Sequence, residues 1–221
     1  MKISEKTLDV LKNFATINTG LVFKTGNVLR TISKEKNVLA RAEVEENFEQ
    51  DFAIYDLNRF LSVLNSIGSA EIELDKDAKR MRFLDNGKEV ADCGLTDSSM
   101  VVSPPDKDLS IKNPEVCFTL SKEVFQKVLR MAGVMGLPNI TVRGDRKTIY
   151  LEAIDVKNPD SDRFFVEVGE TSAEFQSVFV TENFKMLPGS YEVEISSKGI
   201  ALFKGGVDYW IATEAGSTYD A

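Results

Sequence analysis

The sequence predicts an α+β protein built from repeats of one unit, in which a strand leads through a polar cap into an amphipathic helix and then into another strand. Three observations support this fold class. The order strand, cap, helix and strand recurs along the 221 residues. The candidate helices start near residues 4, 57, 121 and 181. Strand-like stretches alternate between apolar and polar residues. The alternative is an ordinary α+β protein whose helices are evenly spaced by coincidence.

The first unit begins at Ser4, a residue that can accept a hydrogen bond from the first turn of a helix. Glu5 follows it, near the positive end of the helix dipole. Apolar residues then recur at helical spacing, and Asn18-Thr19-Gly20 ends the helix. We expect strands in the runs LVFK, VLRTIS and VLARAEV that follow.

The second unit, Phe52 to Leu74, is the clearest copy. Asp56 is its predicted cap, and the segment after Gly68 alternates as AEIEL, which is typical of a strand with one wet face. Asn86-Gly87 then lies between two strand-like runs and predicts a type I′ hairpin. The buried stripe of the helix comprises Leu57, Phe60, Leu61 and Leu64.

The stretch from Ser98 to Pro114 interrupts the repeat. Pro104-Pro105 excludes a central strand or a helix interior and favours an extended connector. Because this stretch falls near the middle of the chain, we expect two domains, residues 1–108 and 109–221.

The third unit has the strand VCFTL, the cap Ser121 and a helix with an apolar stripe from Val124 to Ala132. ITVRGDRKTIYLEA then reads as strand, turn and strand. The fourth unit is predicted to contain the strand FQSVFV, the cap Thr181, a short helix ENFKML and the turn Pro188-Gly189. YEVEISSKGIALFK and VDYWIATEA close the chain as strands.

The charge is distributed unevenly along the chain. The net charge is −8, which opposes general binding of nucleic acid, yet the segments of the four predicted helices sum to about +4 and the remainder to about −12. A basic helical face on an acidic body favours contact with phosphate groups and not with base edges. The alternative is that these residues are ordinary solvated helix faces. The candidate DNA-facing residues are Lys2, Lys6, Lys12, Arg59, Lys122, Lys127, Arg130 and Lys185.

Motifs for catalysis are missing from the sequence. The chain has no histidine, no Gly-rich phosphate loop and no G-x-S-x-G elbow, so we predict a non-enzyme without metal or cofactor. Carboxylates alone can hold Mg²⁺ in a nuclease, which remains an alternative. The candidates Asp75, Asp77 and Asp145 fall in predicted turns, where acidic residues are common; Asp155 is a further candidate.

Cys93 and Cys117 leave one disulfide open, but a reduced, cytoplasmic protein is the simpler interpretation. We expect no signal peptide and no transmembrane helix, because the N-terminus lacks a continuous apolar segment and no apolar run reaches 18 residues.

Six stretches of the sequence resemble the sliding clamps of T-even-type bacteriophages, the processivity factors of the phage DNA polymerases. They are LKNFATINTG, AIYDLNRFL, VVSPPDK, the helix around VLR, KMLPGSY and ATEAGSTYDA. Their order and spacing extend the resemblance over essentially the whole chain.

This resemblance implies the DNA-clamp fold, with two similar domains, each with helices packed on antiparallel sheets. It also implies a closed homotrimeric ring that encircles duplex DNA, with the helices lining the hole. An ATP-driven clamp loader, the DNA polymerase and factors of late viral transcription are the implied partners, in the cytoplasm of an infected bacterial host. The resemblance places the pocket for a partner peptide near the connector, which Val101, Val102, Pro104 and Pro105 mark. A non-enzymatic, β-rich structural oligomer of a virus is the alternative function.

Overall fold

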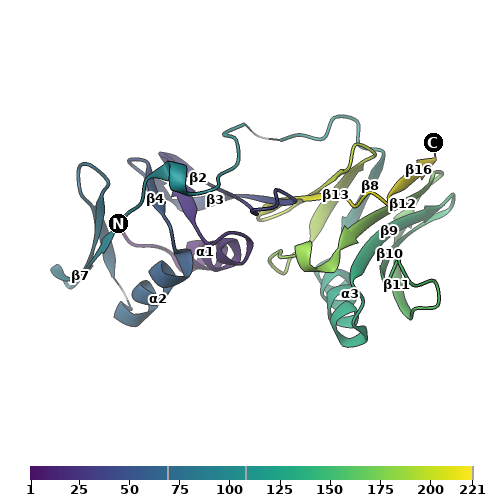
Figure 1. The fold of residues 1–221 in the computed structure, drawn as a ribbon, viewed down its shortest axis with the longest axis horizontal. Coiled ribbons are helices and arrows are strands. Elements are labelled where there is room, and N and C mark those ends of the chain that lie inside the picture. Colours follow the sequence, from purple (N-terminus) through teal and green to yellow (C-terminus); the bar gives the residue numbers. More distant parts are fainter. Residues whose placement is uncertain (69, 108, 221) are drawn as a thin grey trace. The chain divides into compact units, whose positions relative to one another are not determined.

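The computed structural model describes residues 1–68, 70–107 and 109–220 and divides the chain into two compact units, Met1–Asp106 and Lys107–Ala221 (Figure 1). Each unit combines an α-helix or helices with antiparallel sheets, so the predicted α+β class is confirmed. The domain boundary expected after residue 108 falls on Asp108, which lies outside the described residues. No helix in the described part of the chain is long and apolar enough to cross a membrane.

The first unit contains two α-helices that pack against each other, and α1 also packs on β2 and β3 (Figure 1). Strands β4, β1, β2 and β3 are hydrogen-bonded in that order, and β5, β6 and β7 form a separate three-stranded sheet. The elements are α1 (Glu5–Ile17), β1 (Leu21–Phe23), β2 (Gly26–Ile32), β3 (Val38–Phe48), β4 (Phe52–Ile54), α2 (Leu57–Ile67), β5 (Glu71–Leu74), β6 (Arg80–Asp85), β7 (Lys88–Gly94) and the 3₁₀ turn η1 (Ser98–Met100).

Three buried phenylalanines, one from each of β1, β3 and β4, pack together in the first unit. The ring of Phe23 stacks on that of Phe52, with 4.4 Å between centroids, and Phe48 meets both rings edge-on. Offset-stacked and edge-on pairs of this kind each contribute about 0.5–1.5 kcal/mol beyond their burial. The cluster joins the strand that precedes α2 to the strands that follow α1.

The hairpin between β6 and β7 has the predicted turn. Asp85 pairs with Lys88, so Asn86 and Gly87 form a two-residue loop. Their φ angles are 49° and 75°. Two successive positive φ values define the type I′ turn that matches the twist of the strands. The sequence prediction is confirmed here.

The second unit contains one α-helix, among its described residues, and two groups of strands. β11, β10, β9, β12 and β16 form a five-stranded sheet, and β15, β14, β13 and β8 are hydrogen-bonded in that order. α3 packs on β10 and β11. The elements are β8 (Val116–Leu120), α3 (Lys122–Met135), β9 (Asn139–Asp145), β10 (Thr148–Ile154), β11 (Arg163–Glu170), β12 (Glu174–Val180), the 3₁₀ turn η2 (Thr181–Asn183), β13 (Tyr191–Ser196), β14 (Ile200–Lys204), β15 (Asp208–Ala212) and β16 (Thr218–Asp220).

The predicted fourth helix is wrong. After β12 the chain makes only the 3₁₀ turn η2, and Val180, not Thr181, stands at its cap position without a side-chain cap. Pro188 explains part of this result, because a proline disfavours α conformation in the residue before it, here Leu187. A helix of six residues also recovers little of its nucleation cost.

Two buried phenols hold the segment that replaces this helix. The Leu187 N–H donates to the Tyr209 hydroxyl at 3.1 Å, and the Tyr191 hydroxyl donates to the Leu187 carbonyl. Burial raises the pKa of Tyr209 to about 12, so its hydroxyl stays protonated near neutral pH. Tertiary hydrogen bonds thus take the place of a helical ladder.

The carboxylate of Glu46 anchors the start of α1. It accepts the backbone N–H of Ser4 at 2.5 Å and the hydroxyl of Thr7. Partial burial raises the pKa of Glu46, but the hydrogen bonds from Thr7 and Ser4 outweigh it and leave the pKa below its usual value. The charged form of Glu46 therefore stabilises the fold.

We predict that Glu46→Gln lowers the free energy of unfolding by about 1 kcal/mol at neutral pH, because an acceptor oxygen is replaced by an NH₂ donor. Since the folded state lowers this pKa, the contribution is fully present above the unfolded pKa and disappears as pH falls through the folded value. The stability difference from wild type, measured by urea unfolding, should shrink between pH 6 and about 3. The exposed Glu49→Gln is the control. A difference that stays constant over this pH range would contradict the role of Glu46.

Candidate nucleic-acid interface

The basic residues near α1 all have carboxylate partners. The three lysines are exposed, and each ammonium lies within 4 Å of a carboxylate oxygen. The pairs are Lys2–Glu71 at 3.5 Å, Lys6–Glu45 at 3.7 Å and Lys12–Asp9 at 3.2 Å. The side of the first unit that was expected to attract phosphate is therefore charge-compensated.

The basic residues of α3 have no such partners in the described ranges. Ser121 caps this helix by accepting the Val124 N–H at 3.3 Å, as predicted. Lys122, Lys127 and Arg130 are exposed, and their spacing puts them within an arc of about 140° around the helix. We call these three cations the "α3 basic face". Glu123, in the first turn of the helix, adds one negative charge beside them.

Lys127 also lies over an aromatic ring. Its ammonium is 5.6 Å from the centroid of Phe164 on β11, so the side chain leans along the sheet while its charge stays at the surface. This contact restrains one of the three cations without neutralising it.

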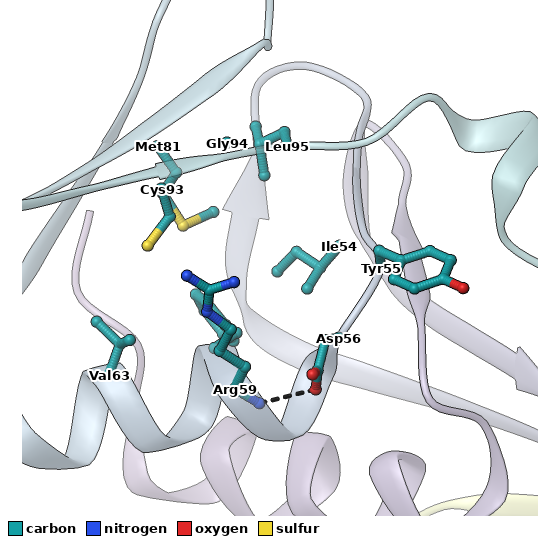
Figure 2. A pocket seen from close by; sticks show the side chains of 10 residues that line it. Ile54, Tyr55, Asp56, Arg59, Val63, Met81, Cys93, Gly94 and Leu95 are labelled. Atoms are coloured by element: carbon teal, nitrogen blue, oxygen red, sulfur yellow. Dashed lines mark hydrogen bonds between the residues drawn. The ribbon is translucent and has the colours of Figure 1, made fainter.

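Arg59 is placed differently from the other candidates. Asp56 caps α2 by accepting the Arg59 N–H at 2.9 Å, as predicted. Figure 2 shows the Arg59 side chain rising from α2 toward Met81 and Cys93. There it lines a mainly apolar pocket of about 160 Å³ that also includes Phe60 and Val63.

Lys185 is exposed but does not belong to a helix, because it follows η2. The lost fourth segment does not alter the summed helical charge, because Lys185 and Glu182 cancel there; the sum falls from +4 because Lys2 precedes α1. Lys6 and Lys12 cancel Glu5 and Asp9 in α1, Arg59 adds one charge and α3 adds two. The α-helices of the described chain therefore carry +3, and the remainder of the protein carries −11.

The residues named from sequence for the peptide pocket hold the connector to the first unit. Val101 is buried against Val22 and Ala53. The Val102 carbonyl accepts a hydrogen bond from the side-chain amide of Asn18 at 2.8 Å. Of the two prolines, the first is buried and the second exposed. Their role in binding a partner stays a prediction.

A pocket of about 290 Å³ lies further along the connector. The indole Nε1–H of Trp210, on β15, is buried, and no described residue accepts it. Two ammonium groups, of Lys112 and Lys198, belong to the same lining. The complete lining consists of Leu109, Ser110, Ile111, Lys112, Ser196, Lys198, Ile200 and Trp210. The pocket therefore offers a mainly apolar cavity with two lysines in its lining.

Sequence reasoning missed this pocket because its lining is discontinuous in the chain. One signal was available, since Trp210 is the single tryptophan and follows Tyr209 in a strand-like run. A large aromatic residue with a polar N–H often serves a surface that is partly apolar and partly wet.

The carboxylates considered for a metal-dependent nuclease shape turns. Asp75 accepts the N–H groups of Lys79 and Arg80, and Asp145 accepts those of Lys147 and Thr148. The described residues contain no group of three or more side chains that could hold a metal ion, and both cysteines are free thiols. The turn interpretation is confirmed for Asp75 and Asp145.

Comparison with solved structures defines the fold. The chain is similar to PCNA from A. fulgidus, in a structure with the C-terminal region of FEN-1, with a TM-score of 0.71 and 15% identity over 99% of this chain and 100% of that chain. It is also similar to the Helicobacter pylori beta clamp, with a TM-score of 0.70 and 13% identity over 97% of this chain and 65% of that one. The fold is therefore that of the DNA clamps.

Sequence comparison gives the family. A family model described as DNA polymerase processivity factor matches residues 2–86, and one described as gp45 sliding clamp, C terminal, matches residues 117–215. The sliding clamp of Vibrio phage KVP40 is 33% identical over 97% of this chain and all of its own length. That of Enterobacteria phage T4 is 30% identical over the full length of both. The chain belongs to the sliding clamp family of T4-type phages, a non-catalytic family of polymerase processivity factors.

Proposed function

We propose that three copies of this chain close into a ring around duplex DNA and tether the phage DNA polymerase to its template. The observation that carries the proposal is the α3 basic face, which stands on a chain of net charge −8. An acidic body repels DNA from most of the surface, so duplex approaches where the cations are concentrated. The contacts are to phosphates and are therefore independent of base sequence.

A ring retains DNA by topology and does not need tight contacts. Strong binding to each phosphate would slow movement along the duplex, whereas a modest charge with intervening water permits it. A helical charge of only +3 in the described chain suits this requirement. The DNA-facing role of Lys2, Lys6, Lys12, Arg59, Lys122, Lys127, Arg130 and Lys185 is part of the proposal.

Two edge strands support ring closure. β7 is the outermost strand of its three-stranded sheet, and β11 is outermost in the five-stranded sheet. Val90 on β7 is 53% exposed and Phe165 on β11 is 49% exposed. Long edge strands with apolar side chains are suited to pairing with another chain. Because the two edges differ, pairing β7 of one copy with β11 of the next is head-to-tail and can close a ring.

The pocket beside Trp210 supports the tethering of partners. An extended peptide can place an apolar side chain in the cavity, which Ile200 and Trp210 help to line. Lys112 and Lys198 favour a peptide that carries negative charge. We include the DNA polymerase, an ATP-driven clamp loader and factors of late viral transcription among the partners, as the family resemblance implies, in the cytoplasm of the infected host.

We predict that the loaded protein dwells on closed circular or end-blocked DNA and leaves linear DNA with open ends quickly, because only a ring is held by topology. Fluorescently labelled protein, loaded with the phage clamp loader and ATP, would be followed by single-molecule imaging on both substrates. Equal rates of loss from the two DNA substrates would contradict the proposed closed ring.

We predict that Val90→Asp and Phe165→Asp each reduce the population with three times the 24.6 kDa chain mass, because a buried carboxylate opposes strand pairing. Sedimentation velocity over a concentration series measures this population, since a weak ring dissociates on dilution. Met100→Asp, at a residue that is 64% exposed on η1, is the matched control. Unchanged masses for both edge variants would exclude β7–β11 pairing.

We predict that Ile200→Asp weakens binding of the phage DNA polymerase about tenfold or more, because the carboxylate enters an apolar cavity. Calorimetry with the purified polymerase measures the affinity, and sedimentation checks that the ring persists. Val156→Asp, at an exposed apolar residue outside the pocket lining, is the control. An unaltered affinity for the Ile200 variant would show that the polymerase docks elsewhere.

A further inference from the structure

The two parts of the candidate DNA interface differ in charge although both are rich in lysine. Around α1, three lysines face five carboxylates, so the side-chain sum is −2; α3 carries three cations and one carboxylate, so its side-chain sum is +2. The five carboxylates around α1 are Glu5, Asp9, Glu45, Glu46 and Glu71. The imbalance comes from the last three, which belong to strands and not to the helix, and of these Glu45 and Glu71 pair with lysines.

Backbone contacts place Glu45 and Glu71 beside the lysines. Met1 and Ile72 exchange two backbone hydrogen bonds of 2.7 Å, which sets Lys2 next to Glu71. β3 has an irregular register with β2, so that residues 44–47 lie between its paired positions. An irregularity of this kind re-aims side chains, and both Glu45 and its neighbour Glu46 reach α1.

A lysine that keeps an intramolecular carboxylate nearby contributes little to DNA binding. Binding gains free energy when a protein cation displaces a counterion condensed on the phosphates. A neutral ammonium–carboxylate pair displaces little, and its carboxylate repels the phosphate that approaches. The free cations of α3 carry no such penalty in the described chain.

We propose that Glu45 and Glu71, by pairing with lysines, lower the affinity of the α1 region for DNA. The α3 basic face is then the principal contact to phosphate. The inference rests on the proposed encircling of duplex DNA and adds the residues that keep the affinity of the protein for DNA low. The competing explanation is that the two pairs stabilise the fold. Exposed pairs of this kind contribute little to stability, so that explanation predicts a small loss of stability and no change in DNA binding.

The test compares three multiple variants of the full chain. Glu45→Gln with Glu71→Gln frees Lys6 and Lys2 from their carboxylate partners. Lys122→Ala, Lys127→Ala and Arg130→Ala together remove the α3 basic face. Glu174→Gln with Glu192→Gln is the matched control, because it removes two exposed carboxylates from β12 and β13, one of them paired with Arg146. Fluorescence anisotropy with a short blunt-ended duplex, over a series of salt concentrations, gives the affinity and its salt slope.

We expect the Glu45/Glu71 variant to bind the duplex about 3- to 10-fold more tightly at low salt, with a salt slope steeper by about one for each additional phosphate that a released lysine neutralises. The α3 variant should bind more weakly with a shallower slope, and the control should follow wild type. Thermal unfolding and sedimentation establish that each variant is folded and assembled to the same extent as wild type.

Two results overturn the inference. One is a Glu45/Glu71 variant that binds as wild type does, and the other is an equal increase in affinity in the control, which would assign the effect to net charge alone. Retention of the wild-type protein on circular DNA is measured separately. A negative result for Glu45 and Glu71 therefore does not contradict the proposed ring, because the retention experiment tests the ring separately.

Discussion

Hydrogen bonds from backbone N–H groups to a capping side chain fix the start of each α-helix of the described chain. Ser4, Asp56 and Ser121 each accept an N–H from the first turn of the helix that follows. These bonds satisfy donors that a helix cannot satisfy internally, and they fix the residue at which each helix begins. The apolar stripe of each helix is then buried, which leaves the opposite side and its charges exposed. The start of the helix and its buried stripe together decide where the basic side chains of α1 and α3 lie.

Local signals were readable from the sequence because their physics is local. The caps, the Asn86-Gly87 turn and the proline-rich connector each depend on residues adjacent in the chain. The missing fourth helix and the strand β11 depend on tertiary contacts, namely the phenols that hold Leu187 and the pairing of β11 with β10. The carboxylate partners Glu71 of Lys2 and Glu45 of Lys6 could not be predicted for the same reason, since both lie on strands, whereas the pair Lys12–Asp9 lies within α1.

Affinity and retention are separate quantities in a ring. Tight contacts raise affinity but oppose movement, whereas closure raises retention without opposing movement. The charge arrangement of this chain suits a low affinity for DNA, because few cations attract duplex DNA and several of them are compensated by nearby carboxylates. The stability of the subunit can therefore be set by its aromatic cores, independently of how strongly it holds DNA.

Trp210 has an optical consequence. It is the single tryptophan of the chain and lines the pocket beside the connector, and its buried indole N–H has no described acceptor. Indole emission depends on the polarity and hydrogen bonding around this group, so all of the tryptophan fluorescence of the protein originates at one place. Occupancy of that pocket can thus be followed in the unmodified protein, without a dye and without altering any residue.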